Sequence, residues 1–199
     1  MAFSSKTFKY FIDDKIQFSC RLKSIKCEAK NANGHQCKKQ SVIVTPLCWI
    51  HLLHQKHLRI KPSRYGQGLF ASDPKKGENA VVFRRGQTII EYGGDVIDET
   101  ELIRRYDGFT APYGVGIDSR NGDNIYKDGA CNRGIGGLAN HRSASQRPNA
   151  HFGFTRNNVL VLIADEPIKN NQEIFIDYNK GSRGKRYIFH DPKVRYGTK

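Results

Sequence analysis

Short apolar runs separated by turn residues make up most of the chain beyond residue 64, and no other sequence feature constrains the fold as strongly. Each run is at most six residues long, which suits strands and is too short for ordinary helices. The runs occupy residues 68–71, 80–83, 88–92, 114–117, 159–163 and 173–178. The 19 glycines in 199 residues supply the turns that short strands need. The sequence therefore predicts a mostly β fold with few helices.

Three local signals refine this expectation. An Asn-Gly pair within residues 118–124 is typical of a tight hairpin turn, so the strands on either side of it should pair. Residues 98–106 form the clearest helix, because Asp98 is a favourable N-cap, acidic residues follow it, and two arginines come last, as the helix dipole prefers. Near the N-terminus, the apolar residues 8–12 could add an edge strand or dock on a core.

The net charge of +14 is concentrated at the two ends of the chain. Residues 1–63 carry 12 Lys/Arg and 3 Asp/Glu, residues 64–179 carry 14 and 15, and residues 180–199 carry 7 and 1. Basic ends favour contact with nucleic acid or an acidic protein surface, while a solvated surface that aids solubility is the alternative. No apolar run is long enough for a membrane span or a secretory signal, so we expect a soluble intracellular protein without membrane contact.

A Cys/His-rich segment precedes the strand-rich part of the chain. Cys27, Cys37, Cys48 and His51 follow the spacing Cys-x9-Cys-x10-Cys-x2-His, which matches a closed tetrahedral zinc site. A segment this short cannot bury enough apolar surface to hold its shape, so zinc would supply its folding energy. His54 could replace the last ligand, and four unrelated side chains are the alternative.

The spacing of this segment resembles the plant WRC zinc motif, which implies DNA contact or targeting. The Trp-Arg-Cys triplet of that motif is replaced here by Leu47-Cys48-Trp49. Cys20 and Cys131 lie outside the pattern. Because disulfides are rare in a reducing compartment, each of these two is expected to be a buried, inert thiol.

Four separated segments lie between residues 64 and 178. Their order along the chain is more informative than any single segment. They are residues 64–71 with a Gly-x-Gly loop, residues 91–97 with a strand that ends at a glycine pair, residues 137–150 with an Asn-His pair and a later Pro-Asn pair, and residues 173–178. Taken singly, each could be an ordinary turn or strand. The glycines of the first segment would let the backbone approach a ligand closely.

This succession resembles the SET domain family across about 115 residues. The segments correspond to the family's glycine loop, its E-Y-x-G segment, its R-F-x-N-H-S-C-x-P-N segment and its G-E-E-L-x-x-D-Y terminus. The resemblance implies a β fold in which the Asn-His segment and the terminal segment cross in a knot-like arrangement and build a pocket for S-adenosylmethionine. A narrow channel would lead a substrate lysine in from the opposite face.

The same resemblance implies roles for individual residues. The cofactor-binding residues would be Tyr65, Gly66, Gln67 and Gly68 around the methionine part, with Asn140 and His141 at the amino group and the adenine. Tyr178 would be the catalytic tyrosine. Tyr92 and Tyr113 are candidates for further channel walls, although each could equally be a core aromatic, and Phe175 or Ile176 could also line the pocket.

The chemistry of lysine methylation suits these residue types. A lysine amine has a solution pKa near ~10.4 and becomes a nucleophile only after it loses its proton, which a largely apolar channel favours by desolvation. The positive sulfonium lowers that pKa further. Transfer then needs alignment and a polar cage around a dispersing charge, which backbone carbonyls and tyrosine rings supply without a metal or a base triad.

The chain departs from the family pattern around the Asn-His pair and in the tail. Gly137-Leu138 stands where the family usually has Arg-Phe, and the loop 142–147 is three residues longer and lacks the usual cysteine. That cysteine normally joins a zinc site formed with a cysteine-rich tail, and residues 179–199 contain no cysteine. We therefore expect no zinc behind the active site, so residues 187–189 or the N-terminal module must close the channel.

The sequence as a whole predicts an N-terminal arm and zinc-binding module at 1–60, a SET catalytic domain at 61–179 and a basic tail at 180–199. The expected activity is S-adenosylmethionine-dependent methylation of a protein lysine, with a histone tail as substrate and the nucleus as location. The alternative is a SET-like module without catalysis that binds chromatin or nucleic acid through its zinc module and basic ends. Methyltransferases of DNA or RNA generally use a doubly wound sheet, which the strand pattern does not suggest.

Acidic residues gather in sequence around the predicted helix. They are Asp95, Asp98, Glu99, Glu101 and Asp107. They could receive the basic tail of a histone, or they could form an ordinary solvated face.

Overall fold

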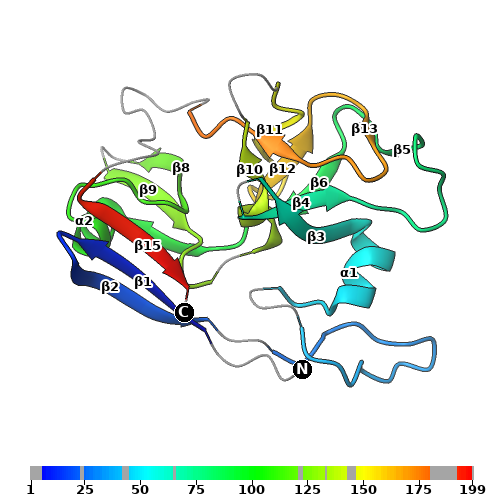
Figure 1. Ribbon diagram of the computed structural model, residues 1–199, viewed down its shortest axis with the longest axis horizontal. Coiled ribbons are helices and arrows are strands. Elements are labelled where there is room, and N and C mark those ends of the chain that lie inside the picture. Colours follow the sequence, from blue (N-terminus) through cyan, green and yellow to red (C-terminus); the bar gives the residue numbers. More distant parts are fainter. Residues whose placement is uncertain are drawn as a thin grey trace.

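Short strands predominate in the computed structural model of the chain (Figure 1). The structure describes residues 6–22, 25–41, 45–64, 66–120, 123–132, 134–142, 147–179 and 192–198. Its helices are α1 (Trp49–Lys56), α2 (Glu99–Tyr106) and the 3-10 helix η1 (Ile135–Leu138). The prediction of a mostly β fold with few helices is confirmed. Among the described residues, no helix has both the length and the apolar character needed to cross a membrane.

Within the described residues, the strands form six small sheets. In sheet order these are β15 (Val194–Thr198), β1 (Lys6–Ile12) and β2 (Lys15–Leu22); β10 (Asn140–His141) and β14 (Phe175–Ile176); β11 (Ala150–Phe154), β12 (Leu160–Ala164) and β6 (Thr88–Glu91); β13 (Ile168–Lys169) and β5 (Val81–Phe83); β3 (Leu58–Ser63) and β4 (Gly66–Ala71); β7 (Asp95–Asp98), β9 (Asp123–Asp128) and β8 (Gly114–Arg120). Neighbouring strands are antiparallel except β10 and β14. The pairing of β8 with β9 confirms the predicted hairpin.

Helix α2 forms where its capping signals predict it. The Asp98 side chain accepts a hydrogen bond from the backbone N–H of Glu101 at 2.8 Å, which satisfies a donor that the first turn leaves unpaired. The helix ends at Asp107, which adopts the left-handed conformation with φ of 50°. These local contacts explain why a helix of eight residues is stable between two strands of one sheet.

One hydrophobic core joins the Cys/His segment to the strand-rich part of the chain. Leu162 of β12, together with Ile174 and Ile176 near the end of the chain, belongs to the same buried cluster as Cys27, Cys48 and Leu52. Figure 1 shows α1 beside β3, and Leu58 of β3 is fully buried in this cluster. The Cys/His segment therefore shares its core with the strands that follow it.

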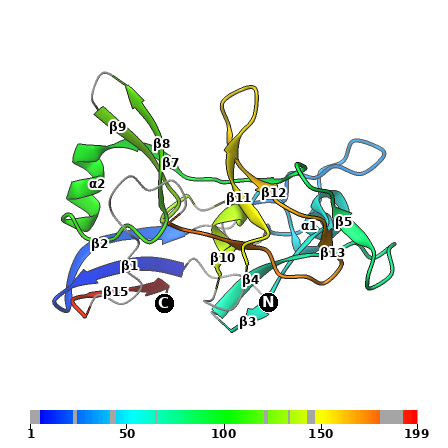
Figure 2. The ribbon, with the colours of Figure 1, turned by 90° about the horizontal axis from the view of Figure 1, so that it is seen from above.

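A second core holds both ends of the chain. The expected apolar stretch at 8–12 lies within β1, the middle strand of the three-stranded sheet that β15 and β2 complete. We call this the terminal sheet. Phe8 and Tyr10 of β1 are fully buried and cluster with Tyr106 of α2, and the rings of Tyr10 and Tyr106 meet edge to face at 4.9 Å. Both views show the terminal sheet on the side of α2 (Figures 1 and 2).

A disulfide fastens the terminal sheet to the rest of the molecule. The prediction that Cys20 and Cys131 are inert thiols is wrong, because the two form a disulfide with their Cα atoms 5.7 Å apart. Cys20 lies in β2, and Cys131 follows β9. The pairing arises only when the terminal sheet packs against the segment after β9, so an argument from spacing and compartment could not reveal it.

Strand β14 lies between two earlier segments of the chain, β10 on one side and the segment around Asn149 on the other. β14 runs parallel to β10, with Asn140 opposite Phe175 and His141 opposite Ile176. From the other side, the backbone N–H of Asn149 donates to the carbonyl of Phe175 at 3.1 Å, and the Asn149 side-chain oxygen accepts from the Phe175 N–H at 2.9 Å. This arrangement agrees with the predicted knot-like crossing.

Candidate active site

The glycine loop opens β4 beside the end of β3. Gly66 has φ of +102°, a conformation that side-chain-bearing residues rarely adopt. At Gly68 a Cβ atom would lie 2.9 Å from Cβ of Ser63 and would also clash with the Glu173 carboxyl group. Close approach of these three segments therefore requires glycine at position 68. Tyr65, predicted as a cofactor-binding residue, lies outside the described residues.

Asn140 of β10 reaches back to this loop. Its side-chain amide donates one hydrogen bond to the backbone carbonyl of Gln67 at 3.2 Å and another to Oε1 of Glu173 at 2.8 Å. The second oxygen of the same carboxylate accepts from the Ser63 hydroxyl at 3.0 Å. The structure thus brings the predicted residues of the glycine loop and Asn140 together, around a carboxylate that the sequence analysis did not single out.

His141 and Tyr178 lie side by side at the crossing. The backbone N–H of Tyr178 donates to Nδ1 of His141 at 3.1 Å, and the two rings are 5.3 Å apart. Burial lowers the pKa of His141, the nearby Asp177 carboxylate acts in the opposite direction, and Arg142 lowers it further. A neutral ring with Nδ1 as acceptor carries its proton on Nε2, which makes Nε2 a hydrogen-bond donor.

The Tyr178 hydroxyl points at the main chain just before the Asn-His pair. It donates to the carbonyl oxygen of Ala139 at 3.0 Å. Ala139 follows η1, and η1 packs against Tyr92, which directly follows β6. A Cβ atom added at Gly136 would lie 3.3 Å from the Cα atom of Tyr92. The Tyr92 segment and the Tyr178 hydroxyl therefore both contact residues 136–139.

Tyr92 and Tyr113 contact each other through a backbone carbonyl. Tyr92 is 4% exposed, and its hydroxyl donates to the carbonyl oxygen of Tyr113 at 2.9 Å. The Tyr113 ring instead turns toward the terminal sheet, where it lies edge-on to Phe8 at 5.9 Å and to Tyr196 at 6.4 Å. Tyr92 and Tyr113 are thus close neighbours, and the ring of Tyr113 belongs to the aromatic cluster around the terminal strands.

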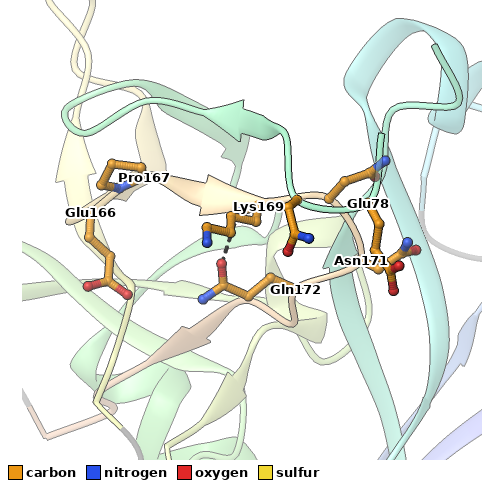
Figure 3. Close-up of a pocket in the computed structure, with 8 residues that line it drawn as sticks. Glu78, Glu166, Pro167, Lys169, Asn171 and Gln172 are labelled. Carbon is orange, nitrogen blue, oxygen red and sulfur yellow. Dashed lines mark hydrogen bonds between the residues drawn. The ribbon is translucent and has the colours of Figure 1, made fainter. Parts of the chain in front are cut away.

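Two open surface hollows lie near the turn between β13 and β14. The first, of about 540 Å³, is lined by Glu78, Asn79, Glu166, Pro167, Lys169, Asn170, Asn171 and Gln172 (Figure 3). Its polar groups hold the loop: Gln172 accepts from the backbone N–H of Lys169, and Asn170 donates to the carbonyls of Asp73 and Lys76. This hollow contains none of the predicted site residues, so its size does not mark the site. The second hollow is lined in part by Asn149, Glu173 and Phe175, at the edge of the crossing.

A candidate metal centre lies in the N-terminal segment. The ligand atoms of Cys27, Cys37, Cys48 and His51 all lie within 4.8 Å of one another. Nδ1 of His51 is 3.2 Å from Sγ of Cys48 and 3.4 Å from Sγ of Cys27. Zinc bonds of about 2.3 Å to sulfur and about 2.0–2.1 Å to nitrogen place tetrahedral neighbours roughly 3.5–3.8 Å apart, so the donor set fits zinc.

Local structure explains how these four side chains converge. Cys48 is the N-cap of α1, which puts it one helical turn from His51, while His54 is exposed and outside the cluster. Burial acts to raise the pKa of Cys48, but hydrogen bonds from the backbone N–H groups of His51 and Ile50 and from the Cys27 and Cys37 side chains lower it overall. Such N–H groups stabilise the thiolate that a zinc ligand must be.

The sequence pattern of the SET domain matches residues 66–179, more than half of the chain. The chain belongs to the SET domain family. Two solved structures of the polycomb repressive complex 2 are similar in fold over part of the chain. One is ctPRC2 in an autoinhibited conformation bound to S-adenosylmethionine, at 21% identity, a TM-score of 0.47, 62% of this chain and 15% of that one. The other is the Chaetomium thermophilum complex, at 23% identity, a TM-score of 0.46, 61% of this chain and 15% of that one. No curated protein matches.

Within this SET domain, sequence reasoning missed Glu173 and the carbonyl oxygen of Ala139. The carboxylate of the terminal motif was a visible signal for Glu173, whereas a main-chain carbonyl has no sequence signal at all. Residues 143–146 of the longer loop 142–147, and the proposed channel-closing residues 187–189, lie outside the described residues. Of the tail, the described part forms β15, which pairs with β1.

Proposed function

We propose that this SET domain transfers a methyl group from S-adenosylmethionine to the ε-amine of a lysine in a protein. The observation that carries the proposal is the meeting of the Asn140-His141 pair with Tyr178 at the crossing of β10 and β14. Around it lie the three kinds of group that the reaction needs: a glycine loop with accessible backbone, a neutral histidine, and a tyrosine hydroxyl beside a backbone carbonyl.

The cofactor would occupy the side of the crossing that faces the glycine loop. Gly66, Gln67 and Gly68, with Tyr65 before them, would hold the methionine part of the cofactor. Asn140 would bind its amino group, and His141 would bind at its adenine. When bound, S-adenosylmethionine supplies the methyl group on a positively charged sulfonium.

The lysine side of the site would be lined by Tyr92 and Tyr178, and Tyr113 would contribute the carbonyl oxygen that holds the Tyr92 hydroxyl. Burial of Tyr92 and the packing of η1 against its strand give this region an apolar wall, which favours the neutral, nucleophilic amine. The Ala139 carbonyl oxygen and the Tyr178 hydroxyl present partial negative charge where positive charge disperses during transfer. Their fixed positions align the amine for in-line displacement, so no general-base triad is needed.

Zinc in this proposal is structural. The four side chains would complete a tetrahedral site, and two of them, Cys27 and Cys48, are buried in the core that continues into β3 and β4. α1 directly precedes β3 in the chain, and the last residue of β3, Ser63, hydrogen-bonds Glu173. Zinc would therefore stabilise the strand that supports the glycine loop. The division of the chain at residues 60 and 180 stays a prediction.

A histone tail as substrate, and the nucleus as location, rest on the family rather than on the acidic residues near α2. Glu101 pairs with Arg104 and Arg105, and Asp95 also pairs with Arg105. Asp98 caps the helix. These groups are engaged within the molecule, which favours their role as structural charges. Contact of the basic ends with nucleic acid is the corresponding proposal for a chromatin substrate.

Transfer of radiolabelled methyl from S-adenosylmethionine to purified histones and nucleosomes tests this function. We expect label on protein with the unaltered chain, and a loss on the order of a hundredfold or more in Tyr178→Phe, which removes one hydroxyl at the reacting centre. Tyr126→Phe on β9 is the matched control and should keep its activity. Cofactor binding without label on any protein would favour the non-catalytic module, and no cofactor binding would contradict the proposal.

A further inference from the structure

Glu173 occupies a junction of three segments that the proposed function uses separately. Its carboxylate accepts from the Ser63 hydroxyl of β3 at 3.0 Å and from the Asn140 amide of β10 at 2.8 Å. It also lies against Gly68, where an added Cβ atom would clash with the carboxyl group. The carboxylate therefore touches the glycine loop, the Asn-His segment and the strand before the loop at once.

The backbone around Glu173 is held by hydrogen bonds from both sides. Its carbonyl oxygen accepts from the Asn149 side chain at 2.8 Å, and the next N–H, of Ile174, donates to the carbonyl of Leu69 at 2.8 Å. Glu173 also forms a bridge with Phe70 of β4. These bonds fix the position of the Glu173 backbone relative to the site.

The carboxylate dictates which way the Asn140 amide faces. Glu173 Oε1 and the Gln67 carbonyl can only accept hydrogen bonds, and both lie on the NH2 side of the Asn140 amide. The amide cannot rotate by 180° without turning its own oxygen toward two acceptors. Its Oδ1 is consequently presented on the opposite side as an acceptor, which is the chemistry that an ammonium group requires.

Glu173 also leaves negative charge beside the site. Within the described ranges, no Lys, Arg or His side chain forms an ion pair with it. A half-buried carboxylate with two hydrogen-bond donors and no cationic partner favours a positively charged ligand nearby. The amino-acid part of S-adenosylmethionine carries such a charge on its ammonium group.

We propose that Glu173 is a positioning residue for the cofactor: it orients the Asn140 amide so that Oδ1 receives the ammonium group of the methionine part. This role rests on the proposed function, because it requires that the cofactor bind here. It acts on affinity for the amino-acid part of the cofactor and not on the transfer step, since Glu173 hydrogen-bonds Asn140 and Ser63, whereas the Tyr178 hydroxyl bonds Ala139.

Glu173→Gln tests the role at constant side-chain size. The glutamine offers one acceptor oxygen in place of two, so the Asn140 amide and the Ser63 hydroxyl compete for it and the orientation of the Asn140 amide is less firmly set. We expect S-adenosylhomocysteine, measured by calorimetry, to bind about tenfold to a hundredfold more weakly, as for loss of a hydrogen bond to a charged group. 5′-Methylthioadenosine lacks the amino-acid part and should bind equally well to both proteins. At saturating S-adenosylmethionine, kcat of Glu173→Gln should stay within about threefold of the value for the unaltered protein, while KM for S-adenosylmethionine rises. The reason is that Glu173 acts on binding of the cofactor and not on the transfer step.

Glu166→Gln is the matched control, because Glu166 lines the same surface hollow as Glu173, and it should leave both affinities, kcat and KM unchanged. Equal loss of affinity for both ligands, or a fall in the unfolding midpoint of the ligand-free protein, would make Glu173 a structural residue and overturn the proposal. Unchanged affinity of Glu173→Gln for S-adenosylhomocysteine would overturn it as well. If the unaltered protein binds neither S-adenosylmethionine nor S-adenosylhomocysteine, the proposed function itself fails, and this role with it.

Discussion

The disulfide between Cys20 and Cys131 should contribute a large part of the stability of this small protein. It links β2 of the terminal sheet to the segment after β9, across a sequence separation of 111 residues. Replacing both residues in Cys20→Ser/Cys131→Ser removes the link and keeps two small polar side chains. The aromatic cluster of Phe8, Tyr10 and Tyr106 still holds the terminal sheet, so we expect the variant to fold.

The magnitude follows from the length of the loop that the disulfide closes. In the chain-entropy treatment, a loop of this length restricts the unfolded chain by about 5 kcal/mol at 25 °C, and losses of native disulfides in small proteins are about 2–5 kcal/mol. For a protein of this size each kcal/mol shifts the unfolding midpoint by about 2–4 °C. The double variant should therefore unfold roughly 5–15 °C below the unaltered protein.

Two measurements check this expectation. Thermal unfolding followed by circular dichroism compares the two proteins with and without reductant, and reductant should lower the midpoint of the unaltered protein only. Thiol counting in denaturant with a metal chelator should find three reactive thiols before reduction and five after it, since three of the five cysteines are free. Five thiols before reduction, together with equal midpoints for both proteins, would refute the reasoning.

Three further changes should have defined effects. Cys48→Ser or a strong chelator should release one zinc per chain, measured with a zinc-sensitive dye. Loss of zinc should also weaken cofactor binding, because the metal centre shares its core with β3. Unchanged cofactor binding would show that the metal centre does not support the cofactor site. Asp128→Ala should lower the free energy of unfolding, measured by urea titration, by about 3–5 kcal/mol. The reason is that Arg105 and the Tyr106 hydroxyl lose their buried partner. A loss below about 1 kcal/mol would contradict this expectation. The Arg104 and Arg105 guanidinium groups lower the pKa of Glu101 from 4.5 to about 2. Its stabilising effect is thus present above about pH 4.5 and lost as the pH falls toward 2, and Glu101→Gln should flatten that part of the stability profile.

Local features of the fold were predictable because they depend on neighbours in the chain. The cap at Asp98 and the hairpin of β8 and β9 involve residues a few positions apart, and both form as predicted. The apolar stretch in β1 was recognised as a strand or docking segment. Its partner β15, however, starts 182 positions after Ile12, and nothing in either segment specifies the other.

The candidate site divides in the same way. The order of the family motifs singled out Asn140, His141 and Tyr178, and the fold brings them together at one crossing. The motif could not show that the Asn140 amide contacts a carboxylate, or that the Tyr178 hydroxyl contacts the Ala139 carbonyl. These contacts depend on ångström-scale placement of backbone segments, which residue types alone do not encode.

The sequence by itself determined the short-strand rhythm, the caps of α2, the zinc-ligand spacing and the succession of SET motifs, because each of these is a local pattern of residue types. Only the tertiary structure decided that Cys20 meets Cys131, that Asp128 is buried with Arg105, and that the two ends of the chain share one sheet. The physical reason is that such contacts join residues brought together by packing of the whole chain. Many pairings are compatible with the same local patterns, and burial of the two cores selects among them.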